Sequence, residues 1–173
     1  MSAEMGDHGT SDDIVGQYVY ADIQGETHRI YYEESGPTDG IPILCQHTAG
    51  TNNGEWRHFL ANDSITDEFR VVAYDLPYHG KSVPPTDAEW WQEDYTIDGR
   101  RFADTIVAIS DAIGLQDPIF LGSSMGGTIT LELADWYPEE FSALIGLETG
   151  AHCPGFFIDW LAHPEVNISE VAS

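Results

Sequence analysis

The chain has 173 residues, of which 30 are acidic and only six are basic, so its formal net charge at pH 7 is −24. Such a length suits one domain with its own core. The charge argues against nucleic acid and anionic membrane surfaces as partners, because both are bound through positive patches that replace counterions. The acidic residues are scattered along the chain, which resembles the surfaces of proteins from cells that keep molar salt in the cytosol, where charge repulsion is strongly screened. An acidic protein from an ordinary cell is the alternative.

The N-terminus, the apolar stretches and the cysteines bear on the cellular compartment of the protein. The first 13 residues read as a flexible acidic leader, because they lack the basic and apolar regions of a signal peptide. No apolar stretch approaches the length of a transmembrane helix. The two cysteines, Cys45 and Cys153, do not make a disulfide framework, and Cys45 lies in an apolar run. We therefore expect reduced thiols and a cytoplasmic protein.

The first half of the chain predicts strands. Segments 16–23 and 27–34 are rich in aromatic and β-branched residues and lie either side of a glycine turn, which predicts an antiparallel pair. Segments 41–48 and 69–76 are short continuous apolar runs, the pattern of strands that are covered on both faces. A short helix is expected between them at 55–60.

The second half alternates helices with strands. A helix is expected within 94–114, where one apolar stripe has intervals of four, three and four residues: Phe102, Ile106, Ile109 and Ile113. Buried strands are expected at 118–123 and 141–149, with a helix at 125–136 that ends before a proline. This order predicts an α/β fold, a mostly parallel sheet with helices on both faces. Sites in such sheets lie at the carboxyl ends of the strands.

The stretch GSSMG, residues 122–126, fits the pattern G-x-S-x-G between a predicted strand and a predicted helix. We call it the elbow. In this context Ser124 occupies a sharp, strained turn that exposes its hydroxyl, and Gly122 and Gly126 avoid side chains that would collide across the bend. An ordinary Gly/Ser turn is the alternative. The flanking strand, the helix and the polar loops at other strand ends favour a nucleophile.

From about residue 14 to residue 150 the chain resembles the N-terminal part of the α/β-hydrolase-fold superfamily. The elbow carries the likeness, together with the loops that follow strands 41–48 and 69–76. The resemblance implies a serine hydrolase that acts on an ester or related carbonyl substrate through an acyl-enzyme on Ser124. It implies a small-molecule substrate and neither a metal nor another cofactor.

The loop after the first buried strand departs from the superfamily pattern. Where the superfamily usually has His-Gly, this chain has His47 and Thr48, followed by Ala49 and Gly50. We call residues 47–50 the oxyanion loop. The resemblance implies that the backbone N–H groups of Ala49 and Met125 form an oxyanion hole, in which each donor can be worth about a hundredfold in rate.

The loop DLPYHGKS, residues 75–82, matches the superfamily's D-x-P-G-x-G-x-S, with Tyr78 in place of the first glycine. The resemblance implies that this loop supports the site structurally. We therefore expect no catalytic role for Asp75, His79 or Ser82.

A serine nucleophile needs a base, and the base needs an orienting carboxylate. The resemblance implies the chain order nucleophile, acid, histidine, and some members place the acid after the strand that follows the nucleophile's helix. Glu148 lies at that place. Because a glutamate at the end of an apolar strand is costly to bury alone, we expect it to have a partner. It is either the triad acid or a structural hydrogen-bonding group.

The base itself is not identified. His152 and His163 follow Glu148, whereas His47 and His58 precede it. None of them lies in a loop after a late strand, where the superfamily keeps its base.

Residues 151–173 read as the beginning of a lid, because the segment GFFIDWL is apolar enough to cover a pocket. A connector or a core helix is an equally economical interpretation. A complete member of the superfamily continues with a lid, two more strands, their helices and the histidine. We therefore expect a fragment or truncated product with low activity, or a companion chain or homo-oligomer that completes an otherwise unpaired strand.

Ser124 at the nucleophile position disfavours some of the reaction types found in the superfamily. Haloalkane dehalogenases and epoxide hydrolases of the superfamily use aspartate at this position, so both are disfavoured. Carboxylesterases, carbon–carbon bond hydrolases and perhydrolases remain, because the pocket and lid set the substrate. A non-catalytic small-molecule-binding member of the same fold, or an inactive remnant, is the alternative.

Overall fold

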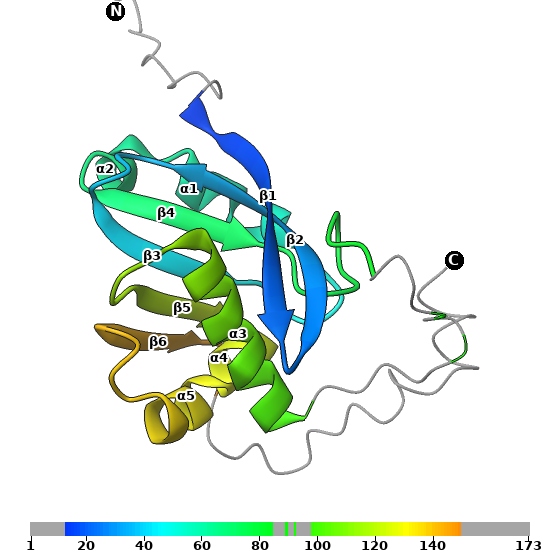
Figure 1. Cartoon of the computed structure of the whole chain (residues 1–173). Coiled ribbons are helices and arrows are strands. Elements are labelled where there is room, and N and C mark those ends of the chain that lie inside the picture. The colour runs from blue at the N-terminus through cyan, green and yellow to red at the C-terminus, as the bar shows by residue number, and fades with distance from the viewer. Residues whose placement is uncertain (1–12, 85–88, 90–91, 93–97, 150–173) are drawn as a thin grey trace, which may run out of the picture.

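The computed structural model describes residues 13–84, 89, 92 and 98–149, which form one sheet with helices on both sides (Figure 1). The sheet has six strands in the order β1-β2-β4-β3-β5-β6. These are β1 Val15–Ile23, β2 Glu26–Ser35, β3 Ile41–Gln46, β4 Phe69–Tyr74, β5 Ile119–Ser123 and β6 Ala143–Leu147. The β1–β2 and β2–β4 pairs are antiparallel and the other pairs are parallel. The predicted α/β fold with a mostly parallel sheet is confirmed.

Two helical layers cover the sheet. One layer holds the 3₁₀ helix η2 Asn53–Trp56, α1 Arg57–Leu60 and α2 Asp63–Thr66; the other holds α3 Gly99–Ile113, α4 Met125–Thr128 and α5 Thr130–Trp136. Successive residues of the central strands point to opposite layers. Leu44 and Val72 belong to the core beneath α3, whereas Cys45 and Val71 belong to the core beneath α1. Burial on both faces explains the continuous apolar runs in the sequence.

Helix α3 shows how the local sequence sets an element's bounds. It begins at Gly99, where the side chain of Asp98 accepts a hydrogen bond of 2.7 Å from the N–H of Arg101. It ends at Gly114, whose φ of 78° is the left-handed conformation that closes many helices. Its buried stripe contains Phe102 and Ile106, as predicted. The expected start at residue 94 lies outside the described residues.

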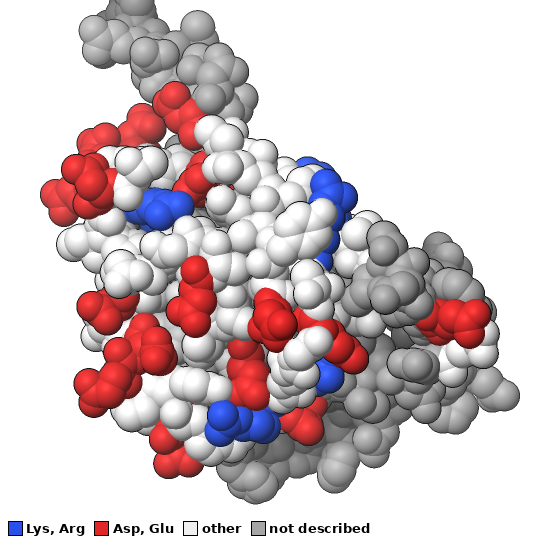
Figure 2. Space-filling view, in the orientation of Figure 1, with Lys and Arg blue, Asp and Glu red and all other residues white. Residues whose placement is uncertain are grey.

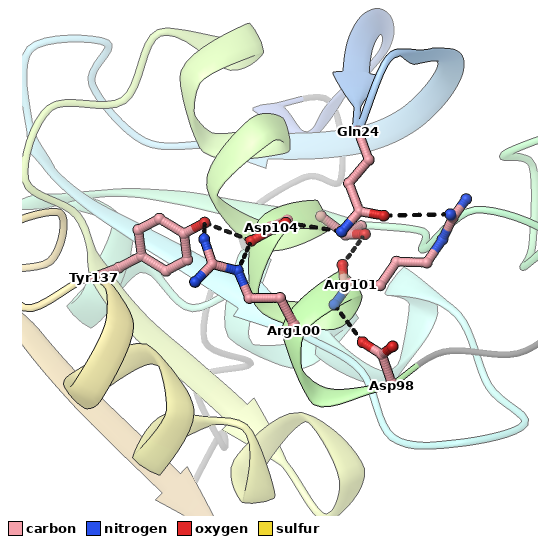
Figure 3. A network of polar contacts seen from close by, with 7 residues as sticks. Gln24, Asp98, Arg100, Arg101, Asp104 and Tyr137 are labelled. Carbon is pink, nitrogen blue, oxygen red and sulfur yellow. Dashed lines mark hydrogen bonds and ion pairs between the residues drawn. The ribbon is translucent and has the colours of Figure 1, made fainter.

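A polar network ties α3 to its neighbours (Figure 3). The Asp104 carboxylate accepts hydrogen bonds from Gln24, in the β1–β2 turn, at 2.8 Å and from Tyr137, just after α5. Arg100 lies 2.8 Å from the same carboxylate and 2.9 Å from the Tyr137 hydroxyl. Burial opposes ionisation of Asp104, but these contacts outweigh it and lower the pKa of that carboxyl. The network fixes α3 between the first hairpin and α5.

Two expectations about elements were wrong in detail. The helix expected at 125–136 is interrupted at Ile129, where the Thr130 hydroxyl donates to the Gly127 carbonyl at 2.7 Å and tightens the turn. The strand expected to be buried at 141–149 is β6, the last strand of the described sheet. Ile145 and Leu147 are each 42% exposed, because no described element packs over them.

The described residues also show how charge is distributed on the surface and how apolar the helices are. Acidic side chains are spread over the face in Figure 2 and do not form one patch, with basic side chains few among them. Within the described residues no helix is long and apolar enough to cross a membrane. The expected leader and lid fall almost entirely on residues 1–12 and 150–173, outside the described part.

Candidate active site

The elbow joins the end of β5 to α4 and has the strained backbone that its sequence predicts. Ser124 has a φ of 50° and a ψ of −106°, which residues with a side chain rarely adopt. A Cβ on Gly122 would lie 2.0 Å from the carbonyl oxygen of Gly126. A Cβ on Gly126 would lie 2.5 Å from Cγ of Gln46, at the end of β3. Gly122 is therefore required by the close approach of backbone, and Gly126 by that of the Gln46 side chain and of the Gln46 carbonyl oxygen at 2.9 Å.

The elbow is attached to the end of β6. The N–H of Ser124 donates to the carbonyl of Leu147 at 2.9 Å, and in the β5–β6 register Ser123 lies opposite Leu147. The next residue, Glu148, therefore lies beside Ser124, although 24 positions separate them in the sequence. The parallel register brings these two predicted site residues together.

Glu148 differs from the buried, partnered carboxylate that we expected. It is exposed, with a φ of 51°, and in the described part of the chain its side chain makes no hydrogen bond. The structural hydrogen-bonding role is therefore not seen among these residues. The role of triad acid stays a prediction.

In the oxyanion loop, His47 is a neutral structural group. It is fully buried, and the N–H of Leu76 donates to its Nε2 at 3.2 Å, so the ring proton sits on Nδ1 and is donated to the Thr48 carbonyl at 2.7 Å. Burial lowers the pKa of His47, which favours this neutral form. Since its one lone pair is occupied, His47 is not placed to act as the base.

The threonine in place of the superfamily's glycine is tolerated without strain. Thr48 is not among the residues with a positive φ, whereas Gly50 has a φ of 73°. The conformation that needs glycine therefore lies two residues later in this loop.

The described residues of the site leave several backbone amides without an acceptor, those of Gly50 and Gly126 included. The N–H of Thr48 is taken, because it donates to the Glu55 carboxylate at 2.8 Å. Within the described residues, the N–H groups of Ala49 and Met125 donate no hydrogen bond. These are the two amides that the resemblance assigns to the oxyanion hole.

The 75–82 loop supports the oxyanion loop. The buried Asp75 carboxylate accepts from the N–H groups of Asn53 at 2.7 Å and Lys81 at 2.6 Å, and the Ser82 hydroxyl donates to the Asp75 carbonyl at 2.7 Å. Tyr78, at the position of the superfamily's glycine, has a φ of 66°. These contacts are structural, so neither Asp75 nor Ser82 is free for chemistry.

Of the other histidines, His58 is exposed on α1. His79 lies against His47, with ring centroids 5.1 Å apart, and contacts the Pro77 carbonyl through Nδ1 at 2.9 Å. His152 and His163 lie outside the described residues. Among the residues that the structure describes, no histidine is hydrogen-bonded to Ser124.

Two further residues at this edge were not predicted from the sequence. The buried Gln46 side chain donates to the His47 carbonyl at 2.8 Å and accepts from the Tyr74 hydroxyl. A glutamine at the end of an apolar run is the signal that could have identified it. Glu55 has no comparable signal, because it is one of 30 acidic residues in the chain.

A mostly parallel sheet covered on both faces, with a strained Gly-flanked turn after β5, defines a protein of the α/β-hydrolase kind. A family model described as alpha/beta hydrolase fold matches residues 41–167. The chain belongs to this family, and the resemblance found in its sequence is confirmed.

The relatives are hydrolases of several types. The chain is 32% identical over 123 residues to the proline iminopeptidase of Neisseria gonorrhoeae and 32% identical over 155 residues to epoxide hydrolase 4 of Mus musculus. These matches cover 69% and 89% of this chain but 36% and 40% of the relatives, so the chain spans well under half of their length. The crystal structure of a bacterial membrane phospholipase A superposes with a TM-score of 0.63 and 28% identity, over 76% of this chain and 38% of that one.

Proposed function

We propose that this chain carries the nucleophile and the oxyanion hole of a serine hydrolase that acts on an ester or related carbonyl compound. The observation that carries the proposal is the strained Ser124 backbone, followed directly by the unoccupied amide of Met125 and accompanied by that of Ala49. Strain of this kind costs of order 1–3 kcal/mol and persists where function requires it.

In the proposed reaction, Oγ of Ser124 bonds to the substrate carbonyl carbon, and the carbonyl electron pair moves onto the oxygen. The N–H groups of Ala49 and Met125 donate to that oxyanion. The intermediate then collapses, the alkoxide leaves with the proton that the hydroxyl gave up to the base, and an acyl-enzyme remains for water to hydrolyse. Glu148 is proposed to orient the base, which lies outside the described residues.

A hydroxyl nucleophile also bears on the choice among the relatives' chemistries. One relative is an epoxide hydrolase, a class in which the superfamily resemblance implies an aspartate nucleophile. Ser124 favours acyl transfer instead, because an alkoxide attacking a carbonyl forms the oxyanion that two amides can stabilise.

The test is covalent labelling with a fluorophosphonate, followed by mapping of the modified peptide by mass spectrometry. We expect slow labelling of Ser124 and little ester turnover, because no described histidine activates the hydroxyl. Ser124→Ala should remove the label. Ser123→Ala is the matched control, since Ser123 is the buried neighbour, and it should keep the label. No adduct on Ser124 after prolonged incubation would favour a non-catalytic small-molecule-binding role.

A further inference from the structure

We propose that Glu55 is a positioning residue of the oxyanion hole: its carboxylate holds Thr48 so that the amide of Ala49 stays directed for catalysis. This inference rests on the proposed function. Oε2 of Glu55 accepts from the N–H of Thr48 at 2.8 Å and from the Thr51 hydroxyl at 3.0 Å. Both bonds end on the same carboxylate oxygen, so one side chain holds two residues of this segment.

The position of Glu55 is itself fixed by its neighbours in η2. The N–H of Asn53 donates to the buried Asp75 carboxylate at 2.7 Å, and Trp56 is buried in the core beneath α1. The side chain of Asn52 caps the same turn by accepting from the N–H of Gly54 at 2.9 Å. Glu55 therefore projects from a rigid turn.

Both peptide planes that flank Thr48 are held. In the first plane, the His47 carbonyl accepts from Gln46 at 2.8 Å and the Thr48 N–H is bound by Glu55. In the second plane, the Thr48 carbonyl accepts from Nδ1 of His47 at 2.7 Å. The Thr51 hydroxyl lies 3.2 Å from that carbonyl and has one proton to share between it and Glu55.

The direction of the Ala49 amide follows from planarity. In a trans peptide the C=O and the next N–H point in opposite directions, so fixing the Thr48 carbonyl also fixes the Ala49 N–H. In this second plane the Thr48 carbonyl is hydrogen-bonded, whereas the Ala49 N–H donates no hydrogen bond to a described residue. Without Glu55, the first plane loses one of its two holds and Thr48 can rotate, which misdirects the Ala49 amide.

The carboxylate is needed for its oxygen, not for its charge. A negative charge near the oxyanion would oppose the reaction, and an amide oxygen in Glu55→Gln can still accept from Thr48 and Thr51. Glu55→Ala removes the acceptor altogether. This pair of variants therefore separates positioning from electrostatics.

The experiment compares the wild type, Glu55→Ala, Glu55→Gln and the exposed control Glu139→Ala, all in the full 173-residue chain. The first measurement is amide hydrogen exchange of Thr48 by NMR, because the Ala49 N–H donates no hydrogen bond to a described residue. The second is the rate of fluorophosphonate labelling of Ser124. We expect Glu55→Ala to speed exchange at Thr48, whose N–H loses its acceptor, and to slow labelling about tenfold, since misdirecting one oxyanion donor costs less than deleting it. Glu55→Gln should be labelled at least as fast as the wild type, and Glu139→Ala should change neither readout.

The outcomes distinguish this inference from the function on which it rests. If exchange speeds up but labelling does not slow, Glu55 does not position the donor. If exchange at Thr48 is unchanged in Glu55→Ala, the inference is overturned whatever the labelling shows. If the wild type is not labelled at all, the proposed function fails, and exchange alone then decides whether Glu55 holds the loop.

Discussion

The strand ends on the two sides of Ser124 are built differently. On the β3 side, buried side chains hold the backbone: Gln46 and His47 are both fully buried, and each donates to a loop carbonyl. On the β6 side, the links are a backbone hydrogen bond from Ser124 to Leu147 and an exposed hydroxyl contact of 2.8 Å between Thr128 and Thr149, and Glu148 is exposed. The difference teaches that, among the described residues, buried side chains preorganise the half of the site proposed to bind an oxyanion. They do not do so for the half proposed to carry the acid.

The largest effect is expected at the elbow, where the two sides meet. In Gly122→Ala the new Cβ would lie 2.0 Å from the oxygen and 2.3 Å from the carbon of the Gly126 carbonyl, and backbone cannot rotate away. We expect the free energy of unfolding to fall by about 3 kcal/mol or more, because overpacking a rigid contact is among the costlier substitutions. Urea unfolding followed by circular dichroism measures it.

The matched control is Gly99→Ala at the first position of α3. A Cβ there meets nothing nearer than 3.7 Å, and alanine is the better helix former by about 1 kcal/mol in a helix interior. Stability should therefore be kept or raised. If Gly122→Ala and Gly99→Ala lose equal amounts of unfolding free energy, the backbone of the elbow is packed no more closely than the start of α3.

The second prediction sharpens the contrast between the two strands. Leu44 in β3 is fully buried, so Leu44→Ala should cost about 2–5 kcal/mol of unfolding free energy. Leu147 in β6 is 42% exposed, and Leu147→Ala should cost less than about 1 kcal/mol. Thermal unfolding of both variants, with sedimentation to record the oligomeric state, provides the measurement. A large loss for Leu147→Ala would show that β6 is covered in solution, as a companion chain or a second copy would cover it.

The fold was largely predictable because burial on both faces leaves a strong trace in sequence. The apolar runs at 41–48 and 69–76 became β3 and β4, and the aromatic segments near the start became an antiparallel hairpin. The exposure of β6 was not predictable from its own residues. ALIGL has the composition of a buried strand, and whether it is covered depends on elements elsewhere.

Within the candidate site, the strained backbone of the elbow was predictable from the sequence. The spacing of Gly122, Ser124 and Gly126 follows from a steric requirement, so the pattern is visible in the letters. The hold on Thr48 by Glu55 is a side-chain contact over seven positions in an irregular segment. No periodicity marks such a contact, and one glutamate among many acidic residues carries no signal of its own.

A smaller loss of stability is expected when the pH is lowered. The β3 side of the site should lose stability before the β6 side does. Burial holds the pKa of His47 below its ordinary 6.5. Near and below pH 6.5 the unfolded chain therefore binds a proton that the folded chain does not bind. The contribution of neutral His47 to stability is complete above pH 6.5 and is lost as the pH falls through that value toward the folded pKa. The protection factors of the oxyanion-loop amides, which correct for the pH dependence of intrinsic exchange, should fall between pH 7.5 and 5.5 before those at 146–149 do.

His28 provides the control for a general effect of acid on the fold. It is 1% exposed, burial lowers its pKa, and neither ring nitrogen makes a hydrogen bond to a described residue, although Oε2 of Glu26 lies 3.5 Å from Nε2. His28→Phe should therefore keep or raise stability at pH 7.5 and reduce its loss at pH 5.5. The early loosening of the oxyanion loop should persist in this variant. If it disappears, acid acts through the hairpin and not through His47.

The smallest predicted effect has opposite signs at two adjacent serines. Ser124→Gly relieves a backbone with a φ of 50°, so the protein should become more stable by about 1 kcal/mol, the strain released less the added entropy of an unfolded glycine. Ser123 has no positive φ and lies in β5, so Ser123→Gly should cost up to about 1 kcal/mol. Differential scanning calorimetry of both variants resolves the two signs. If only Ser124→Gly stabilises the protein, the backbone strain lies on the residue whose hydroxyl is proposed to react. A turn selected only for stability would carry glycine at that position.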